Sequence, residues 1–180
     1  MNKNKINIRA LTTSALMVAL ALILDQIKLF QMPQGGAVTL FGMLPVILLG
    51  YLLGTKYGVL GGLCVGILNL IFGGYVIHPV QLFVDYIAAF AVMGLSGLMR
   101  NRKNGLTKGY ILGVFLRYCC FVVSGTVFFG DYAPANFNAF TWSVWYNLGC
   151  VAVEAVMTII VINIPAVKSS FDKLRSSVSN

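Results

Sequence analysis

Long apolar runs are the feature that most constrains how this chain can fold. Several of them approach the roughly 20 residues that a helix needs to cross about 30 Å of hydrocarbon. Only 10% of the residues are charged, whereas soluble domains carry about 25%. In lipid the backbone must satisfy its own hydrogen bonds, so only helices and closed barrels can span. The runs are continuous rather than alternating as in a barrel, and they predict an all-α integral membrane protein.

Turn and breaker residues divide the apolar runs into six predicted membrane-spanning helices in one domain, residues 1–180. Breakers occur at Pro33–Gly36, Gly54–Thr55, Gly73–Gly74 and Asn104–Gly105, and at Pro134 in the last long loop. We expect the helices at Ile8–Phe30, Val38–Leu53, Tyr57–Phe72, Pro79–Met99, Tyr110–Phe129 and Trp142–Ile164.

Basic residues are distributed unevenly among the predicted loops, and this asymmetry predicts the orientation. Cytoplasmic loops carry an excess of Lys and Arg, so both termini are expected in the cytoplasm. The opposite loops hold one formal charge, Asp131. This topology accounts for the net charge of +8 without nucleic-acid binding. Of the 13 basic residues, 11 lie on the predicted cytoplasmic side: Lys3, Lys5, Arg9, Lys56, Arg100, Arg102, Lys103, Lys108, Lys168, Lys173 and Arg175.

Polar residues inside the apolar runs are the first candidates for function, because a charge at the centre of a membrane costs about 3 kcal/mol or more. Asp25 and Asp85 lie toward the outer ends of their predicted helices. Arg117 and Glu154 lie nearer mid-depth, where a structural role as a buried ion pair is the favoured interpretation. The neutral candidates are Asn69 and Asn147.

Asp85 differs from the other candidates because aromatic and hydrogen-bonding residues accompany it. Tyr75 and Gln81 precede it and Tyr86 follows it directly. Some outer aromatic residues belong to the ordinary interfacial belt, but a carboxylate flanked by aromatic faces suits a flat organic cation. Amides such as Asn147 and Gln81 could then form hydrogen bonds with the ring nitrogens of such a cation. The outer segment before the last helix adds Phe128, Phe129, Tyr132, Phe137, Phe140, Trp142, Trp145 and Tyr146.

The sequence contains no enzyme, metal or nucleotide signature. The four cysteines lie in apolar runs without CxxC spacing, so they are expected to behave as small hydrophobic residues. His78 is the single histidine and has no partner pattern. The glycines of Gly58–Gly66 lack the lysine of a phosphate-binding loop and predict close helix packing instead. No catalysis, cofactor or metal is expected, and active transport would require a separate ATPase.

Several segments together resemble the thiamine-specific substrate-binding subunit, or S-component, of energy-coupling factor (ECF) vitamin transporters. The similarity covers most of the chain and implies a six-helix bundle in the prokaryotic plasma membrane with both termini cytoplasmic. It also implies a high-affinity subunit that captures extracellular thiamine. Its partners would be a transmembrane coupling subunit and two ATPase subunits. The segments are Met32–Gly36, His78–Tyr86, Arg117–Tyr118, Ser124–Gly130 with Tyr132–Pro134, and Tyr146–Asn147.

Position by position, the resemblance implies roles for individual residues. Asp85 would be the acidic ligand-binding residue, and Ala15 and Ala19 match the AxxxA face with which helix 1 docks against the coupling subunit. Phe121 stands where many members have a histidine, so a polar contact is lost. A thiamine precursor or analogue, or another small vitamin, is therefore the alternative ligand. The expected ligand-binding set is Asp85, Tyr86, Tyr75, Asn147, Trp142, Phe129, Phe121, Tyr146, Gln81 and Gly36.

The mechanism expected from these assignments is binding without chemistry. Gly35 and Gly36 give backbone freedom to the loop Pro33–Ala37 between the first two helices. Loops of this kind commonly gate binding sites, so we expect this one to close over the ligand. Phe129 and Trp142 replace other aromatic residues of the family and preserve stacking.

Overall fold

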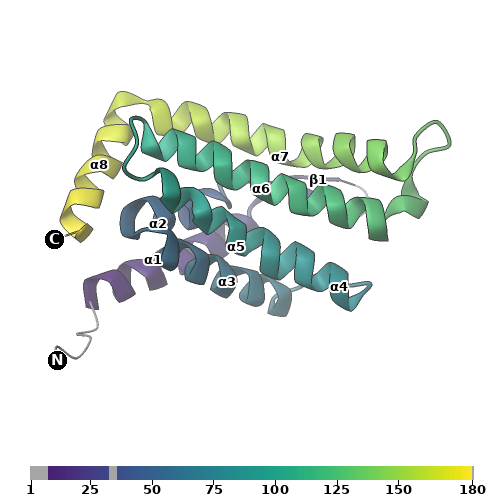
Figure 1. Ribbon diagram of the computed structural model, residues 1–180, viewed down its shortest axis with the longest axis horizontal. Helices are drawn as coiled ribbons and strands as arrows, with labels where there is room; N and C mark the ends of the chain where they lie inside the picture. The colour runs from purple at the N-terminus through teal and green to yellow at the C-terminus, as the bar shows by residue number, and fades with distance from the viewer. Residues whose placement is uncertain (1–7, 33–35, 180) are drawn as a thin grey trace.

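The computed structural model describes residues 8–32 and 36–179 as a mostly helical bundle with one small β-hairpin (Figure 1). Among these residues, four helical stretches have the length and apolar composition of a membrane span. The predicted class, a helical membrane protein, agrees with this composition. The four stretches are α1 (Ile8–Gln26), the continuous helix Pro79–Met99, α6 (Gly105–Phe128) and α7 (Ala139–Asn163).

Two shorter apolar helices, α2 (Leu44–Leu53) and α3 (Thr55–Ile71), pack inside the bundle. They meet at Gly54, whose φ of 97° lies in the left-handed region that favours glycine. With ten residues, α2 rises about 15 Å, roughly half of the hydrocarbon thickness. Eight of those residues are buried, so protein rather than lipid surrounds this helix.

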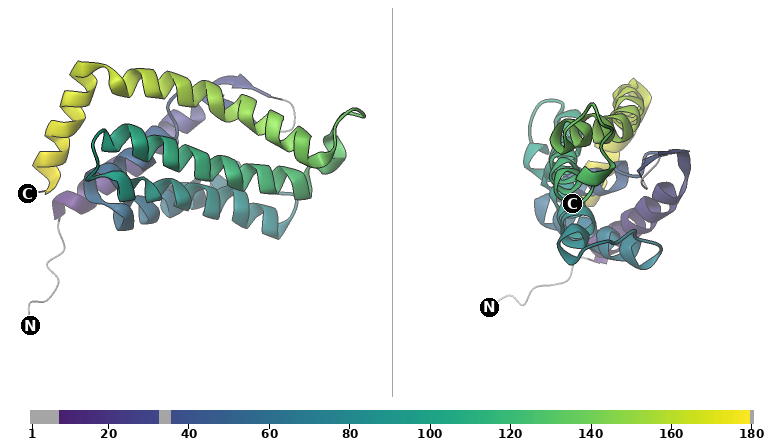
Figure 2. Two further views of the ribbon diagram at one scale, coloured as in Figure 1. Left: turned by 45° about the horizontal axis from the view of Figure 1, so that its top comes forward. Right: turned by 90° about the vertical axis from the view of Figure 1, so that its right-hand side faces the viewer.

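A β-hairpin stands where the sequence predicted the end of the first helix and the start of the second. After α1 ends at Gln26, β1 (Lys28–Gln31) pairs antiparallel with β2 (Ala37–Thr39). The predicted helix ends at Phe30 and Val38 were therefore wrong. A short apolar run can form a strand or a helix, and periodicity alone does not separate them. In Figure 2 the hairpin lies beside α7, away from α4.

The helix Pro79–Met99 is continuous but irregular. It begins as α4 (Pro79–Leu82), widens into the π-helical segment η2 (Phe83–Ala88), returns to α-helix in α5 (Ala89–Met93) and tightens into the 3₁₀ segment η3 (Gly94–Met99). Single π-helical turns within α-helices are rare and occur frequently at functional sites. The acidic candidate of the sequence lies in this π-helical segment.

Glycines bring α3 into backbone contact with the helix Pro79–Met99. Gly58, Gly62 and Gly66 are four residues apart and lie on one face of α3. A Cβ atom at Gly62 would lie 2.2 Å from the carbonyl oxygen of Phe90, and one at Gly94 would lie 2.1 Å from the carbonyl carbon of Gly58. The close packing predicted from Gly58–Gly66 is thus confirmed, as small residues permit in membrane helices.

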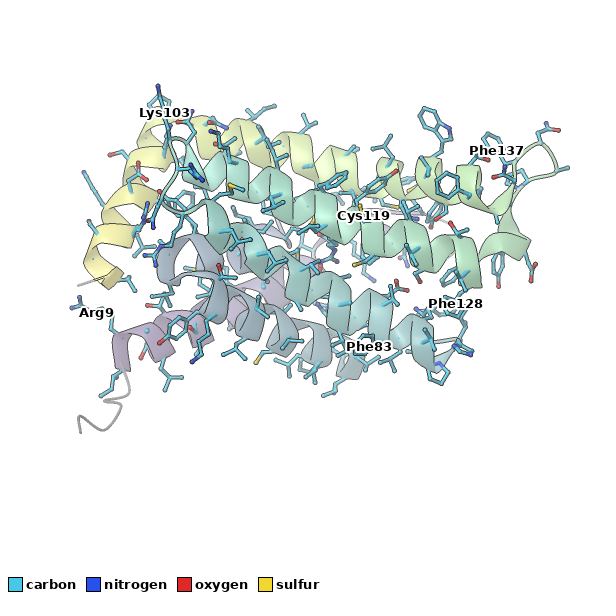
Figure 3. All side chains as sticks on the ribbon, viewed as in Figure 1. Arg9, Phe83, Lys103, Cys119, Phe128 and Phe137 are labelled. Atoms are coloured by element: carbon cyan, nitrogen blue, oxygen red, sulfur yellow. The ribbon has the colours of Figure 1, made fainter. Side chains whose placement is uncertain are left out.

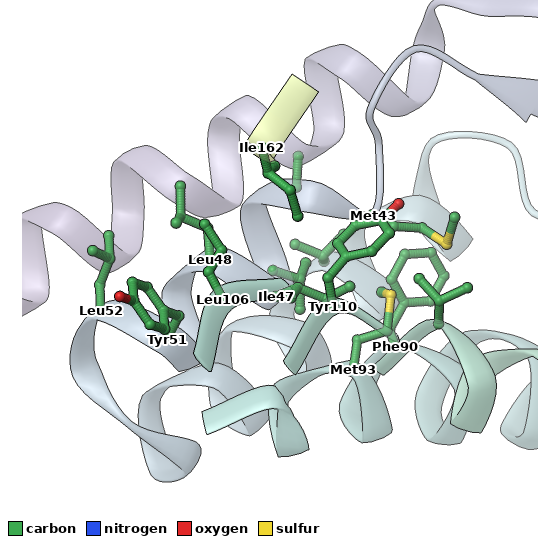
Figure 4. Close-up of a cluster of buried hydrophobic side chains, with 14 of the residues drawn as sticks. Met43, Ile47, Leu48, Tyr51, Leu52, Phe90, Met93, Leu106, Tyr110 and Ile162 are labelled. Carbon is green, nitrogen blue, oxygen red and sulfur yellow. The ribbon is translucent and has the colours of Figure 1, made fainter. Parts of the chain in front are cut away.

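The hydrophobic core surrounds α2, which packs against α1, α3, η3 and α6 (Figure 4). Ile47 and Leu52 of α2 are fully buried, as are Met93 of α5 and Tyr110 of α6. Ile162 near the end of α7 covers the same core and is 1% exposed. These contacts fix the short α2 between the longer helices.

The two ends of the bundle differ in chemistry (Figure 3). Arg9 and Lys103 lie at the end where α1 begins and α8 ends, whereas Phe128 and Phe137 lie at the opposite end. Lys103 of the fourth predicted loop therefore shares an end with both ends of the described chain.

The helix α8 (Pro165–Ser179), which the sequence did not predict, crosses the basic end of the bundle. The Tyr51 hydroxyl donates to Asp172 Oδ1 at 2.6 Å, and Arg175 Nη2 donates to Asn101 Oδ1 at 2.7 Å. Apolar residues spaced three or four apart face the bundle, and this spacing was the available signal for the helix. They are Phe171, Leu174 and Val178.

The glycine contact between α3 and η3 yields a stability prediction. Gly94→Ala should lower the free energy of unfolding by about 1–3 kcal/mol, because the added methyl group overpacks a backbone contact. The matched control is Gly149→Ala, whose Cβ would meet nothing closer than Met32 Cε at 3.8 Å. Thermal unfolding in detergent should show a lower Tm for Gly94→Ala alone, and equal Tm values for both variants would contradict the prediction.

Candidate ligand-binding site

A cavity of about 470 Å³ lies among the β-hairpin, α1, α3, the helix Pro79–Met99, α6 and α7. Its volume falls within the roughly 300–1,000 Å³ of typical small-molecule sites. Every residue of the ligand-binding set predicted from the sequence lines this cavity, although their roles in binding stay predictions. They are Gly36, Tyr75, Gln81, Asp85, Tyr86, Phe121, Phe129, Trp142, Tyr146 and Asn147.

Asp85 places a buried carboxylate at the cavity from the π-helical segment η2. Its Oδ2 accepts a hydrogen bond from Gln81 Nε2 at 2.6 Å. Its Oδ1 is buried beside the Ser124 hydroxyl, and neither atom makes a hydrogen bond of normal geometry to a described residue. Because buried polar atoms are normally hydrogen-bonded, these two atoms are available to a ligand. Ser124, which is 1% exposed, was not in the predicted set.

Gln81 joins the Asp85 carboxylate to the segment that follows α3. Its Oε1 accepts from Ile77 N and its Nε2 donates to Tyr75 O, each at 3.2 Å. The hydroxyl of Tyr86 accepts from Tyr75 N at 2.7 Å. Gln81 is only 2% exposed, and this network holds Tyr75 in the wall of the cavity.

Aromatic rings line two sides of the cavity. Tyr75 and Phe129 have ring centroids 6.4 Å apart on one side. Trp142 and Tyr146, four residues apart on α7, have centroids 5.9 Å apart on another. These rings offer faces to a flat ligand near the Asp85 carboxylate.

Asn147 presents an acceptor rather than a donor. Its Nδ2 is engaged by the backbone carbonyl oxygens of Ser143 at 2.9 Å and Phe121 at 3.3 Å. Its Oδ1 accepts no hydrogen bond from the described residues, so it can receive an amino group. Phe121 contributes its ring to the cavity where a histidine would have offered a nitrogen.

Arg117 and Glu154 do not form the buried ion pair that their mid-depth positions suggested. The Arg117 guanidinium lies 4.1 Å from the ring centroid of Phe90 and 4.9 Å from that of Phe121. In the described part of the chain no carboxylate is within ion-pair distance of it. Glu154 instead accepts from Thr39 Oγ1 at 2.6 Å. Cation–π contacts and a hydrogen bond to the hairpin therefore replace the expected pair.

The charged residues of the cavity leave one formal negative charge in excess. Asp25, Asp85 and Glu154 supply three carboxylates, whereas Lys28 and Arg117 supply two cations, so the sum is −3 + 2 = −1. Lys28 had been assigned to the first predicted helix, and the hairpin brings it to the site instead. This balance complements a monovalent cation.

Of the loop expected to close over the ligand, Pro33–Ala37, residues 33–35 lie outside the described residues. Gly36 and Ala37 both line the cavity. The backbone N–H of Gly36 donates to the Tyr146 hydroxyl at 3.1 Å. At these two positions the connection between the first two helices forms part of the cavity wall.

The predicted docking residues Ala15 and Ala19 lie on a surface of α1 that the rest of the described chain leaves exposed. The buried residues of this helix are Ala10 and Ala21. A face of small side chains is thus open to another membrane helix.

Comparisons with known proteins give consistent matches. Residues 11–173 match the family model described as Thiamine transporter protein (Thia_YuaJ). The chain is 38% identical to the thiamine transporter ThiT of Bacillus subtilis (strain 168) over 163 residues, 82% of this chain and 84% of that protein. It is 31% identical to ThiT of Lacticaseibacillus paracasei over 141 residues, 69% of this chain and 70% of that protein. A solved structure of ThiT from Listeria monocytogenes superposes with a TM-score of 0.77 and 26% identity, covering 92% of this chain and 96% of that one.

The Gln81 network predicts a local loss of order when the amide is removed. Gln81→Met should accelerate amide hydrogen exchange at Ile77 by at least about tenfold, because a hydrogen bond that anchors it is lost. Val80→Met is the matched control, since Val80 is 53% exposed. Exchange followed by mass spectrometry in detergent tests this, and equal exchange of residues 74–78 in both variants would refute it.

Proposed function

The chain belongs to the thiamine transporter family, and we propose that it is the thiamine-binding subunit of an ECF importer. It is a transporter rather than an enzyme, and a multi-pass protein of the cell membrane. The relatives named above are thiamine transporters, so thiamine is the ligand proposed here. Transport would start with capture of thiamine in the cavity.

The observation that carries this proposal is the buried Oδ1 of Asp85, which makes no hydrogen bond of normal geometry to a described residue, in a cavity with one formal negative charge in excess. Thiamine has a cationic thiazolium ring and an amino-bearing pyrimidine ring, both flat. A carboxylate attracts the cation and can accept a hydrogen bond from the amino group. The faces of Trp142 and Phe129 supply cation–π attraction. Phosphorylated forms of the vitamin would bring negative charge against the carboxylates, so the unphosphorylated form is favoured.

Six membrane passes with cytoplasmic termini are the topology that we propose. Support comes from the position of the start of α1 and the end of α8 at the same, basic end of the bundle. The positive-inside tendency puts this end in the cytoplasm. The cavity, lined by Tyr75, Phe129 and Trp142, then opens toward the outside, where thiamine is captured. In this topology α2 and α3 together form the second and third passes.

Delivery of thiamine would require partners, because the chain has no nucleotide-binding motif. We assign this role to a transmembrane coupling subunit and two ATPase subunits, with docking through Ala15 and Ala19. Exposure of both alanines on α1 supports the assignment. No covalent step takes place on this subunit.

A thiamine precursor or analogue is the second candidate ligand, and Phe121 is the observation that favours it. Its ring lies against the Arg117 guanidinium. It has no nitrogen that could hydrogen-bond to a ligand group that a histidine would bind. Titration of purified protein, followed by fluorescence of Trp142 and Trp145, separates the candidates. Saturation by thiamine at lower concentration than by a free pyrimidine precursor, riboflavin or biotin supports the proposal.

Asp85→Asn should weaken thiamine binding by at least about 30-fold, equivalent to about 2 kcal/mol, because the ligand cation loses its buried counter-charge. The amide keeps the size of the side chain, so the fold should persist. Asp131→Asn removes an exposed carboxylate outside the cavity and should leave the Kd unchanged. Calorimetric titration measures both, and an unchanged Kd in Asp85→Asn would disprove the site.

Ala15→Trp and Ala19→Trp should abolish thiamine uptake in cells while the purified variants keep the parental Kd, because a large ring blocks close helix approach. Leu20→Trp is the matched control. Leu20 is 42% exposed, but it lies roughly 100° around α1 from Ala19. Uptake of radiolabelled thiamine in cells that contain the coupling subunits tests this. Loss of binding in the alanine variants, or equal loss of uptake in Leu20→Trp, would argue against the docking face.

A further inference from the structure

One face of α7 holds the β-hairpin along its length. Tyr146, Cys150 and Glu154 are four residues apart and therefore lie on this face. Tyr146 accepts the hydrogen bond from Gly36 N at 3.1 Å, and Cys150 Sγ lies 3.1 Å from Met32 Sδ. Each of the three α7 residues lines the cavity. The hairpin thus separates this face of α7 from solvent on one side of the cavity.

Glu154 holds the base of the hairpin. Its Oε2 accepts from Thr39 Oγ1 at 2.6 Å and its Oε1 accepts from Met43 N at 2.9 Å. Thr39 ends β2 and Met43 directly precedes α2, so one carboxylate joins the hairpin, α2 and α7. Glu154 makes two hydrogen bonds here and Tyr146 makes one to Gly36, which makes this the stronger contact.

The turn between Thr39 and Met43 is a conformation that needs such a tether. Phe41 has φ of 60°, a left-handed value that is rare for a bulky residue. A Cβ at Gly42 would lie 2.8 Å from both Asp25 Oδ1 and Thr39 Oγ1. Strained turns persist where surrounding contacts determine them, and Glu154 provides two such contacts.

We propose that Glu154 is a positioning residue for ligand retention. By fixing Thr39 and Met43 it holds the hairpin against α7, so that Gly36 and Ala37 complete the wall of the cavity. A ligand leaves when the hairpin leaves α7, and the rate of that step depends on the Glu154 hydrogen bonds. As far as the ligand is thiamine, this inference rests on the proposed function.

The first test separates association from dissociation by stopped-flow fluorescence with thiamine. Glu154→Ala should raise the dissociation rate at least about tenfold and change the association rate less than about threefold, because retention rather than encounter is affected. Glu154→Gln should raise the dissociation rate clearly less than Glu154→Ala does, since its amide can still accept from Met43 N and donate to Thr39 Oγ1. Thr39→Val, which removes one of the two hydrogen bonds, should give an intermediate rate.

The second test reads the position of the hairpin without any ligand. Cys150 is 8% exposed, and its thiol lies behind the hairpin. In a background with Cys64, Cys119 and Cys120 replaced by serine, a small water-soluble thiol reagent should label Cys150 at least about five times faster in Glu154→Ala than in the parent. Glu154→Gln should be labelled at the parental rate, and thiamine should slow the labelling of each.

The two tests distinguish this inference from the proposed function. If the parent fails to bind thiamine but Glu154→Ala still accelerates labelling of Cys150, the positioning role is supported and thiamine is the wrong ligand. Unchanged labelling in Glu154→Ala would overturn the inference, as would equal effects of Glu154→Gln and Glu154→Ala on dissociation. If Glu154→Ala does not fold, Thr39→Val decides: faster dissociation and faster labelling support the positioning role, and parental rates of both overturn it.

Discussion

The backbone contact between α3 and the helix Pro79–Met99 is the interaction on which the binding site depends. Glycines on α3 let the two helices approach until side chains no longer separate them, and a Cβ at Gly66 would lie 1.9 Å from the carbonyl oxygen of Tyr86. This contact lies directly behind the π-helical segment that carries Asp85. In lipid, where apolar side chains gain little from facing one another, such close packing is a main source of helix association. The acidic side of the cavity is therefore held by backbone packing.

The opposite side of the cavity is held by hydrogen bonds. There α7 presents Trp142, Tyr146 and Asn147 to the ligand space and also accepts the hairpin through Tyr146 and Glu154. The two sides differ in how easily they can move, because a helix in backbone contact with its neighbour is rigid, whereas a short hairpin held against α7 by hydrogen bonds at Gly36 and Thr39 can detach. One side of the cavity is rigid and contacts the ligand through Asp85, and the other side encloses the ligand and can detach. This combination suits a protein that must both select its ligand and release it.

Much of this arrangement could be predicted from sequence, and the failures have physical causes. The apolar runs, the glycine spacing and the residues gathered around Asp85 are local signals, and the structure brings the predicted residues to one cavity. The hairpin was not predicted because Leu29 and Phe30 extend an apolar run that is typical of a membrane helix. Arg117 and Glu154 were predicted to form an ion pair because both lie near the middle of the membrane. Whether two side chains meet also depends on the directions in which they point around their helices, and depth in the membrane does not give those directions. The amino-acid composition of the segment gives no signal for the π-helical turn.

That π-helical turn means that the site is specified by the number of residues in a helix as well as by their kinds. A π-helical turn contains about one residue more than an α-helical turn, so the side chains before η2 are out of phase with those after it. If the same residues formed a regular α-helix, the backbone hydrogen bonds would be better, but one half of the helix would be rotated by roughly 100° relative to the other. Gln81 and Met93 could then no longer face inward together. For this helix, the more regular geometry and the functional one are different structures.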